Sequence, residues 1–291
     1  STPDQPEGVV ESKNLAARRV ESGNTQFSRG NFDEALYFYE LALEEHRSVD
    51  NGPGVARTLN SIGKLYLEQG NYKEAVNAFS NAREISKRIG ETTITLQSIN
   101  NLGEVELRRG APAEAIPLFE QALAAGAEDN DEQRAIVLHN LATAKVRNGR
   151  LDEGRTHLLE ARQINEELER FTELAANLYM LGAIAAEEDD LDTAREHLLE
   201  ALSYDKRMEH SAGIAKDLMA LGLVERRRGE YESSLDYLQR SLQIHVVRND
   251  APSALLLLDE LEQTARAGGR SAEAEGYAEQ RRRIETAMAG K

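Results

Sequence analysis

The 291-residue sequence contains no cysteine and no tryptophan, and it has only six prolines. Without cysteine, the chain forms no disulfide and offers no thiolate ligand to a metal ion. Long apolar runs are missing as well. The longest, around Leu255–Leu258, is far shorter than the roughly 20 residues that a membrane-spanning helix requires. We therefore expect no direct membrane insertion.

Positive charge is also scarce: the sequence has 35 basic residues and 51 acidic ones, and the formal net charge is −16. A field of this sign repels nucleic-acid phosphates and anionic membrane surfaces, so neither is an expected partner. The apolar content of 40% is enough to build a core, and the abundance of alanine, leucine, glutamate and arginine is typical of a mostly helical protein.

The first residues, STPDQPEG, lack an initiator methionine and include two prolines. We predict that residues 1–14 form a flexible tether. Three origins remain open: removal of methionine before a small residue, trimming of a longer chain, or the mature end of a bacterial lipoprotein whose acylated cysteine precedes Ser1. We lean to the last, which would place the protein in the bacterial cell envelope rather than the cytoplasm.

One pattern recurs every 40 residues, with a single step of 39. The first small residue of each copy defines seven units, at Gly23, Gly63, Gly103, Ala142, Gly182, Gly222 and a degenerate Glu262. Seven residues later comes a second column: Gly30, Gly70, Gly110, Gly149, Asp189, Gly229 and Gly269. A fixed period of this length is typical of stacked repeats.

The other columns predict two helices in each unit. Apolar residues three apart, such as Leu59 and Ile62, share one helix face. Small residues let the paired helices approach closely, and the second glycine fits a left-handed helix end. Asn31, Asn71 and Asp152 are expected to cap the helices that follow.

These columns resemble the tetratricopeptide repeat, and the 40-residue length is similar to the extended subgroup of kinesin light chains, spindle-orientation adaptors and Rap-type regulators. The resemblance implies an all-α, right-handed superhelical solenoid of seven antiparallel helix pairs. We expect one solenoid over residues 15–291, with its last unit, about 251–291, acting as a degenerate cap.

No nucleotide-binding or catalytic signature is found, so we expect no enzyme activity and no cofactor. The acidic run Asp129–Asn130–Asp131 lacks the central glycine and the closing glutamate of a calcium loop, and we expect no metal. His157 and His197 share one column, which we interpret as a packing position.

In the resembled family, the first helix of each unit lines a concave groove. The resemblance implies that partner-binding residues lie in the corresponding columns: Asn24, Phe27, Arg57, Asn60, Lys64, Leu67, Asn100, Leu107, Arg108, His139, Arg147, Tyr179, Lys216, Met219, Leu223, Arg226 and Arg227.

The groove columns hold eight basic and four acidic side chains, a net of +4 within a chain of −16. This contrast favours an acidic, extended ligand segment. The alternative is that Arg108, Arg147, Arg226 and Arg227 neutralise neighbouring glutamates on the same helices. Similarly, Asn60, Asn100 and His139 either bind a peptide backbone or tie adjacent units together.

The sequence therefore predicts a non-catalytic scaffold or adaptor that binds a protein or peptide segment. Two alternatives stay open. One is a regulatory receptor whose pitch changes when a peptide or other ligand binds, and the other is a structural homo-oligomer. The oligomeric state is not predicted.

Overall fold

The computed structural model describes residues 7–126 and 130–289. In these residues it contains fourteen α-helices and no strand, which confirms the all-α prediction. The helices are α1 (Glu7–Ser28), α2 (Phe32–Ser48), α3 (Gly52–Glu68), α4 (Tyr72–Arg88), α5 (Thr92–Arg108), α6 (Pro112–Ala124), α7 (Asp131–Arg147), α8 (Leu151–Glu167), α9 (Phe171–Glu187), α10 (Leu191–Arg207), α11 (Ser211–Arg227), α12 (Tyr231–Val247), α13 (Ala251–Ala267) and α14 (Ser271–Ala289). Within the described residues, none of these helices is long and apolar enough to cross a membrane.

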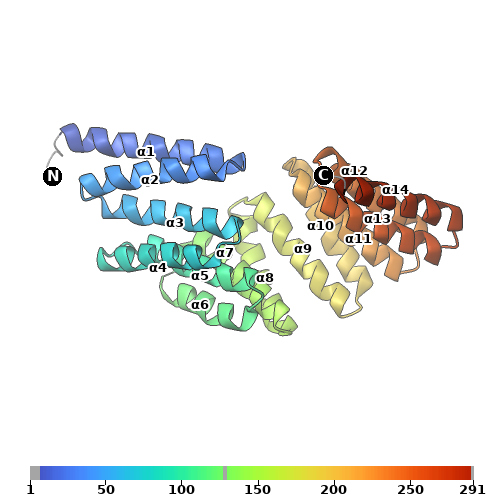
Figure 1. The fold of residues 1–291 in the computed structure, drawn as a ribbon. Coiled ribbons are helices and arrows are strands. Elements are labelled where there is room, and N and C mark those ends of the chain that lie inside the picture. The colour runs from blue at the N-terminus through green and yellow to red at the C-terminus, as the bar shows by residue number, and fades with distance from the viewer. Residues whose placement is uncertain (1–6, 127–129, 290–291) are drawn as a thin grey trace. The chain divides into compact units, whose positions relative to one another are not determined.

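The helices form two compact units, Ser1–His157 and Leu158–Lys291, and α8 contributes residues to both. In the first unit, α1 packs on α2, α3 on α4 and α5 on α6; in the second, α9 packs on α10, α11 on α12 and α13 on α14 (Figure 1). Successive first helices also touch, as α3 does α5 and α9 does α11. That the repeats form one continuous solenoid stays a prediction.

The first glycine column lets the two helices of a repeat cross closely. A Cβ atom placed on Gly103 would lie 2.6 Å from Cε1 of Phe119, and one placed on Gly222 would lie 2.6 Å from Cγ of Leu238. The facing side chains, Tyr39, Phe79, Phe119, Leu198 and Leu238, are at most 2% exposed. The sequence-predicted close approach is therefore confirmed at these crossings.

The second column ends each first helix in the left-handed region. Its members have φ between 65° and 83°, and Asp189, with φ 65°, is the one non-glycine. Glycine adopts this conformation without the steric cost that a Cβ brings. The predicted helix ends are confirmed, and each one fixes where the second helix of a repeat begins.

Two local predictions are corrected. Residues 7–14, assigned to a flexible tether, form the first turns of α1, because Val9, Ser12 and Ala16 share its partly or fully buried face. The remaining tether residues, 1–6, lie outside the described residues. Asn31 and Asn71 occupy N-cap positions without a side-chain cap bond, and their Nδ2 atoms donate to Gln26 and Gln69. Asp152 lies inside α8 and pairs with Arg155.

Candidate functional site

A hollow of about 380 Å³ opens on the first-helix face of the second unit. Three successive first helices, α9, α11 and α13, contribute to it, with one residue from α10. The lining includes four of the residues predicted for the groove, namely Tyr179, Leu223, Arg226 and Arg227. The second unit thus brings most of its predicted groove residues together.

Small side chains create this hollow. Ala183 and Ala186 occupy the columns that hold Lys64 and Leu67 three repeats earlier, and Ala220 faces them from α11. Because alanine leaves the space of a longer side chain empty, the surface sinks between α9 and α11. Leu223 and Leu198 complete an apolar lining.

Tyr179 and Lys216 form one polar element on this face. Lys216 Nζ lies 3.8 Å from the centroid of the Tyr179 ring, within the range of a cation–π interaction. Burial, and then the charge of Asp217, raises the pKa of the Tyr179 hydroxyl above its ordinary value. The hydroxyl therefore stays protonated, and Tyr179 lines the hollow as a neutral aromatic side chain.

The arginines at the rim of the hollow are paired with carboxylates. Arg226 Nη1 lies 2.7 Å from Glu260 Oε2, as an ion contact rather than an aligned hydrogen bond. Arg227 lies 2.8 Å from Asp189 Oδ1, and it also donates a 2.6 Å hydrogen bond to the carbonyl oxygen of Ala186. Each pair joins one repeat to its neighbour.

The arginines of the first unit are engaged in a similar way. Arg108 lies 2.5 Å from Glu68 of the preceding repeat and 3.6 Å from Glu104. Arg147 donates a 3.3 Å hydrogen bond to the carbonyl oxygen of Leu107 at the end of α5. Of these contacts, only Arg108–Glu104 lies within one helix, as the charge-neutralisation alternative expects. Glu68 and Leu107 lie on the preceding first helix, so Arg108 and Arg147 also join adjacent repeats.

The amide row ties repeats together. Ser98 Oγ donates to Asn60 Oδ1 at 3.0 Å, and Asn140 Nδ2 donates to Asn100 Oδ1 at 3.0 Å. Asn60 is 6% exposed and Asn100 is 7% exposed. These contacts correspond to the structural alternative for the row and leave little amide surface to bind a peptide.

Two predicted groove residues of the first unit are core residues instead. Leu67 is 3% exposed and packs with Ala75 and Phe79, while Leu107 is 7% exposed in the cluster that contains Phe119. Their long side chains turn into the repeat because it offers apolar partners there. We correct the assignment of both as ligand contacts.

The other candidates are distributed along the first helices without converging. Asn24 accepts a 2.8 Å hydrogen bond from the Tyr39 hydroxyl, and Phe27 packs edge-on against Phe32. Met219 packs against the apolar core formed by α12, α13 and α14. Arg57 and Lys64 are exposed, and His139 is half-buried.

Sequence reasoning missed three features of the second unit. It missed Glu260, the counterion of Arg226, because the columns do not reveal which side chain reaches across a repeat. It also missed the alanine lining, for which the signal was available as small residues in the groove columns. The third is a carboxyl pair, Asp205 and Asp217.

Asp205 and Asp217 are buried between α10 and α11, with exposures of 5% and 1%. Burial, the charge of Asp205 and a hydrogen bond with it raise the pKa of Asp217 to about 8. His210 Nδ1 lies 2.9 Å from Asp205 Oδ1. Asn165 and Asn177 occupy the same two positions one repeat earlier and are hydrogen-bonded at 2.7 Å. The carboxyl pair thus occupies the positions that a neutral amide pair occupies in the preceding repeat.

No three histidine, aspartate or glutamate side chains are arranged to hold a metal ion in the described part of the chain. Asp129 of the acidic run lies outside it.

The tetratricopeptide repeat family model matches residues 16–88, 67–128 and 133–207, and a second model of the same family matches residues 218–247. Together these matches cover well over half of the chain. No curated protein matches the sequence.

Solved structures share the fold at low identity. BtubC (BKLC) from P. vanneervenii is 20% identical with a TM-score of 0.67, covering 76% of this chain and 93% of its own. The Rap conjugation gene regulator of plasmid pLS20, in complex with the Phr* peptide, is 20% identical with a TM-score of 0.69, covering 97% and 79%. A kinesin light chain-like repeat protein of Podospora anserina is 22% identical with a TM-score of 0.58, covering 67% and 97%.

Proposed function

This chain belongs to the tetratricopeptide repeat family, and we propose that it is a non-catalytic scaffold that binds a peptide segment of another protein in the hollow lined by α9, α11 and α13. One observation carries the proposal. Three successive first helices together form a concave surface with an apolar floor and a polar rim. This combination is typical of sites that bind a ligand by shape and orient it by a few polar groups.

The floor and the rim have different roles in the proposal. A volume of about 380 Å³ is large enough to accept an apolar side chain, which the alanines and Leu223 would contact. The carboxylate of Glu187 and the guanidinium of Arg227 flank this space and would hydrogen-bond the peptide backbone on either side of the anchor.

The charge of the ligand is the finer part of the proposal. An acidic segment was expected from the groove columns, but Arg108, Arg226 and Arg227 already face carboxylates. An acidic ligand would have to compete with those internal partners. We therefore propose an apolar anchor, rather than negative charge, as the feature recognised in this hollow.

A regulatory receptor is the second candidate. It is supported by the similarity to the Rap regulator of plasmid pLS20, which was solved with the Phr* peptide. In that version, the peptide would bind the same hollow and shift the packing of the helices around it.

A peptide-display selection on the immobilised full chain tests the proposal. We expect enriched peptides to share one large apolar residue. Ala183→Phe fills the hollow from an exposed position on α9 and should abolish the enrichment.

The matched control is Ala212→Phe, at an exposed alanine in the first turn of α11 that does not line the hollow. It should enrich the same peptides as the wild type. Equal enrichment of those peptides on the Ala183→Phe protein would refute the site.

A further inference from the structure

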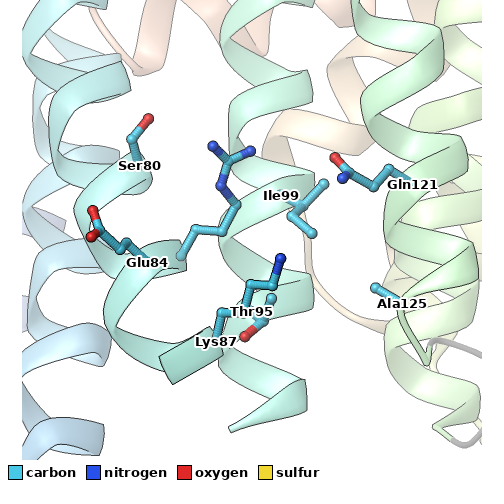
Figure 2. A pocket seen from close by; sticks show the side chains of 8 residues that line it. Ser80, Glu84, Lys87, Thr95, Ile99, Gln121 and Ala125 are labelled. Atoms are coloured by element: carbon cyan, nitrogen blue, oxygen red, sulfur yellow. The ribbon is translucent and has the colours of Figure 1, made fainter. Parts of the chain in front are cut away.

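A second hollow, of about 620 Å³, lies in the first unit between α4, α5 and α6. In Figure 2, Ser80 and Glu84 of α4 lie on one side of the hollow, and Gln121 and Ala125 lie on the opposite side. Thr95 and Ile99 of α5 lie between them. None of these residues belongs to the predicted groove columns. The hollow is therefore distinct from the first-helix face.

A short helix opens this hollow. α6 has 13 residues, whereas α4 and α8 have 17. Its last residue, Ala124, is the counterpart of Glu84 in α4, so α6 ends one turn earlier in its repeat than α4 does. Lys87, in the last turn of α4, lines the hollow.

Two cations, Arg83 and Lys87, line the hollow. Arg83 is half-buried and Lys87 is exposed, and among the described residues neither forms a salt bridge. A smaller hollow adjoins the first through Glu84 and is lined by Arg47 and Arg88, which also form no salt bridge with described residues. The two adjoining hollows thus contain four cationic side chains and one carboxylate, in a chain of net charge −16.

Favourable interaction with helix ends explains only part of this cluster. Arg47, Lys87 and Arg88 lie in the last turns of their helices, where positive charge stabilises the helix dipole. Arg83 lies more than a turn before the end of α4 and is half-buried. The helix dipole therefore does not account for Arg83.

In the second unit, the equivalent arginine has a carboxylate partner. Arg162 occupies the column of Arg83 two repeats later, and its Nη2 lies 3.3 Å from Glu200 Oε1 on the next second helix. The column of Glu200 is occupied by Gln121 in the first unit. The corresponding positions therefore hold an arginine and a carboxylate in α8 and α10, and an arginine and a neutral amide in α4 and α6.

We propose that the hollow between α4 and α6 binds an acidic segment of a partner protein. A glutamate or aspartate of that segment pairs with Arg83, in the role that Glu200 has beside Arg162. Lys87 binds a second carboxylate, one helical turn further along α4. Ile99 and Ala125 provide an apolar floor for the aliphatic part of the ligand side chains.

This site is independent of the proposed peptide site in the second unit. Here the acidic segment would bind mainly to α4 and α6, the second helices of their repeats. Substitutions in one site should therefore leave binding at the other unchanged.

Fluorescence anisotropy with a labelled hexaglutamate peptide tests the inference on the full chain at low salt. We expect saturable binding by the wild type, and binding about tenfold weaker or more for Arg83→Gln with Lys87→Gln, because charge-assisted hydrogen bonds are lost. Gln121→Glu supplies the internal carboxylate found at Glu200. It should weaken binding similarly while thermal stability is kept or raised.

Two controls separate this site from general charge effects. Arg162→Gln removes an arginine from the same column of the second unit and should leave hexaglutamate binding unchanged. Ala183→Phe, which fills the other hollow, should do the same. Equal affinity of the Gln121→Glu and wild-type proteins would overturn the proposal. So would tight binding of a phosphoserine peptide with no binding of hexaglutamate, since that result indicates a phosphate site.

Discussion

Gly103 of α5 lies against the ring of Phe119 of α6, with no room for a Cβ atom between them. Phe119 is fully buried. The same arrangement joins Gly23 to Tyr39 and Gly63 to Phe79 in the first unit, and Gly182 to Leu198 and Gly222 to Leu238 in the second. Close crossing of paired helices is thus repeated along the chain, and at each of these crossings it requires a residue without a Cβ atom.

Gly103→Ala should destabilise the protein by about 1–3 kcal/mol, because the added methyl group overpacks the crossing. Gly276→Ala in α14 is the matched control, since nothing lies within 4 Å of the Cβ position there. That change should stabilise by about 0.5–1 kcal/mol through helix propensity. Denaturant unfolding measures both, and stabilisation by Gly103→Ala would contradict the packing described here.

The helix pairs were predictable because their signals are local. The left-handed ends at Gly30 and Gly70, and the small column at Gly103, depend on backbone geometry that few residues satisfy. The site was less predictable because it depends on neighbours. Leu67 and Ala186 share a column, yet Leu67 enters the core while Ala186 lines a hollow.

The ion pairs between repeats could not be predicted from the sequence either. Arg226 reaches Glu260 and Arg227 reaches Asp189, each on another repeat. The rotamers of long side chains decide such partners, and column positions do not specify rotamers. The columns therefore predicted which arginines lie on the first helices but not which carboxylates they face.

The buried amide pair should show strong coupling. Asn165 Nδ2 donates to Asn177 Oδ1, and both residues are at most 2% exposed. Asn177→Leu strands a buried polar group and should cost about 1–3 kcal/mol. Asn165→Leu combined with Asn177→Leu should cost less than the sum of the single changes, as measured by a double-mutant cycle of unfolding free energies. Simple additivity would show that the two amides do not act together.

The Asp205–Asp217 pair predicts a pH dependence of stability. The pKa of Asp217 is raised from 3.8 to about 8 in the folded protein, so the folded state holds a proton that the unfolded state releases. Its contribution to the free energy of unfolding is complete below pH 3.8 and is lost as the pH rises to about 8. The slope approaches about 1.4 kcal/mol per pH unit for one proton.

Asp217→Asn should remove this slope, as the amide pair one repeat earlier has no such proton. Urea unfolding from pH 5 to pH 9 measures the effect, and the variant should gain stability over the wild type as the pH rises. Asp236→Asn, at an exposed aspartate of α12, serves as the control and should follow the wild-type profile. Parallel profiles for Asp217→Asn and the wild type would contradict a shared proton.

Calorimetric titration of a display-selected peptide into the full chain tests the peptide site most directly. We predict that Ala183→Phe binds the peptide at least about tenfold more weakly than the wild type, because the anchor side chain loses its space and its buried apolar contacts. Ala212→Phe should bind with wild-type affinity. Wild-type affinity in the Ala183→Phe protein, with the fold intact by circular dichroism, would contradict peptide binding in the hollow of α9, α11 and α13.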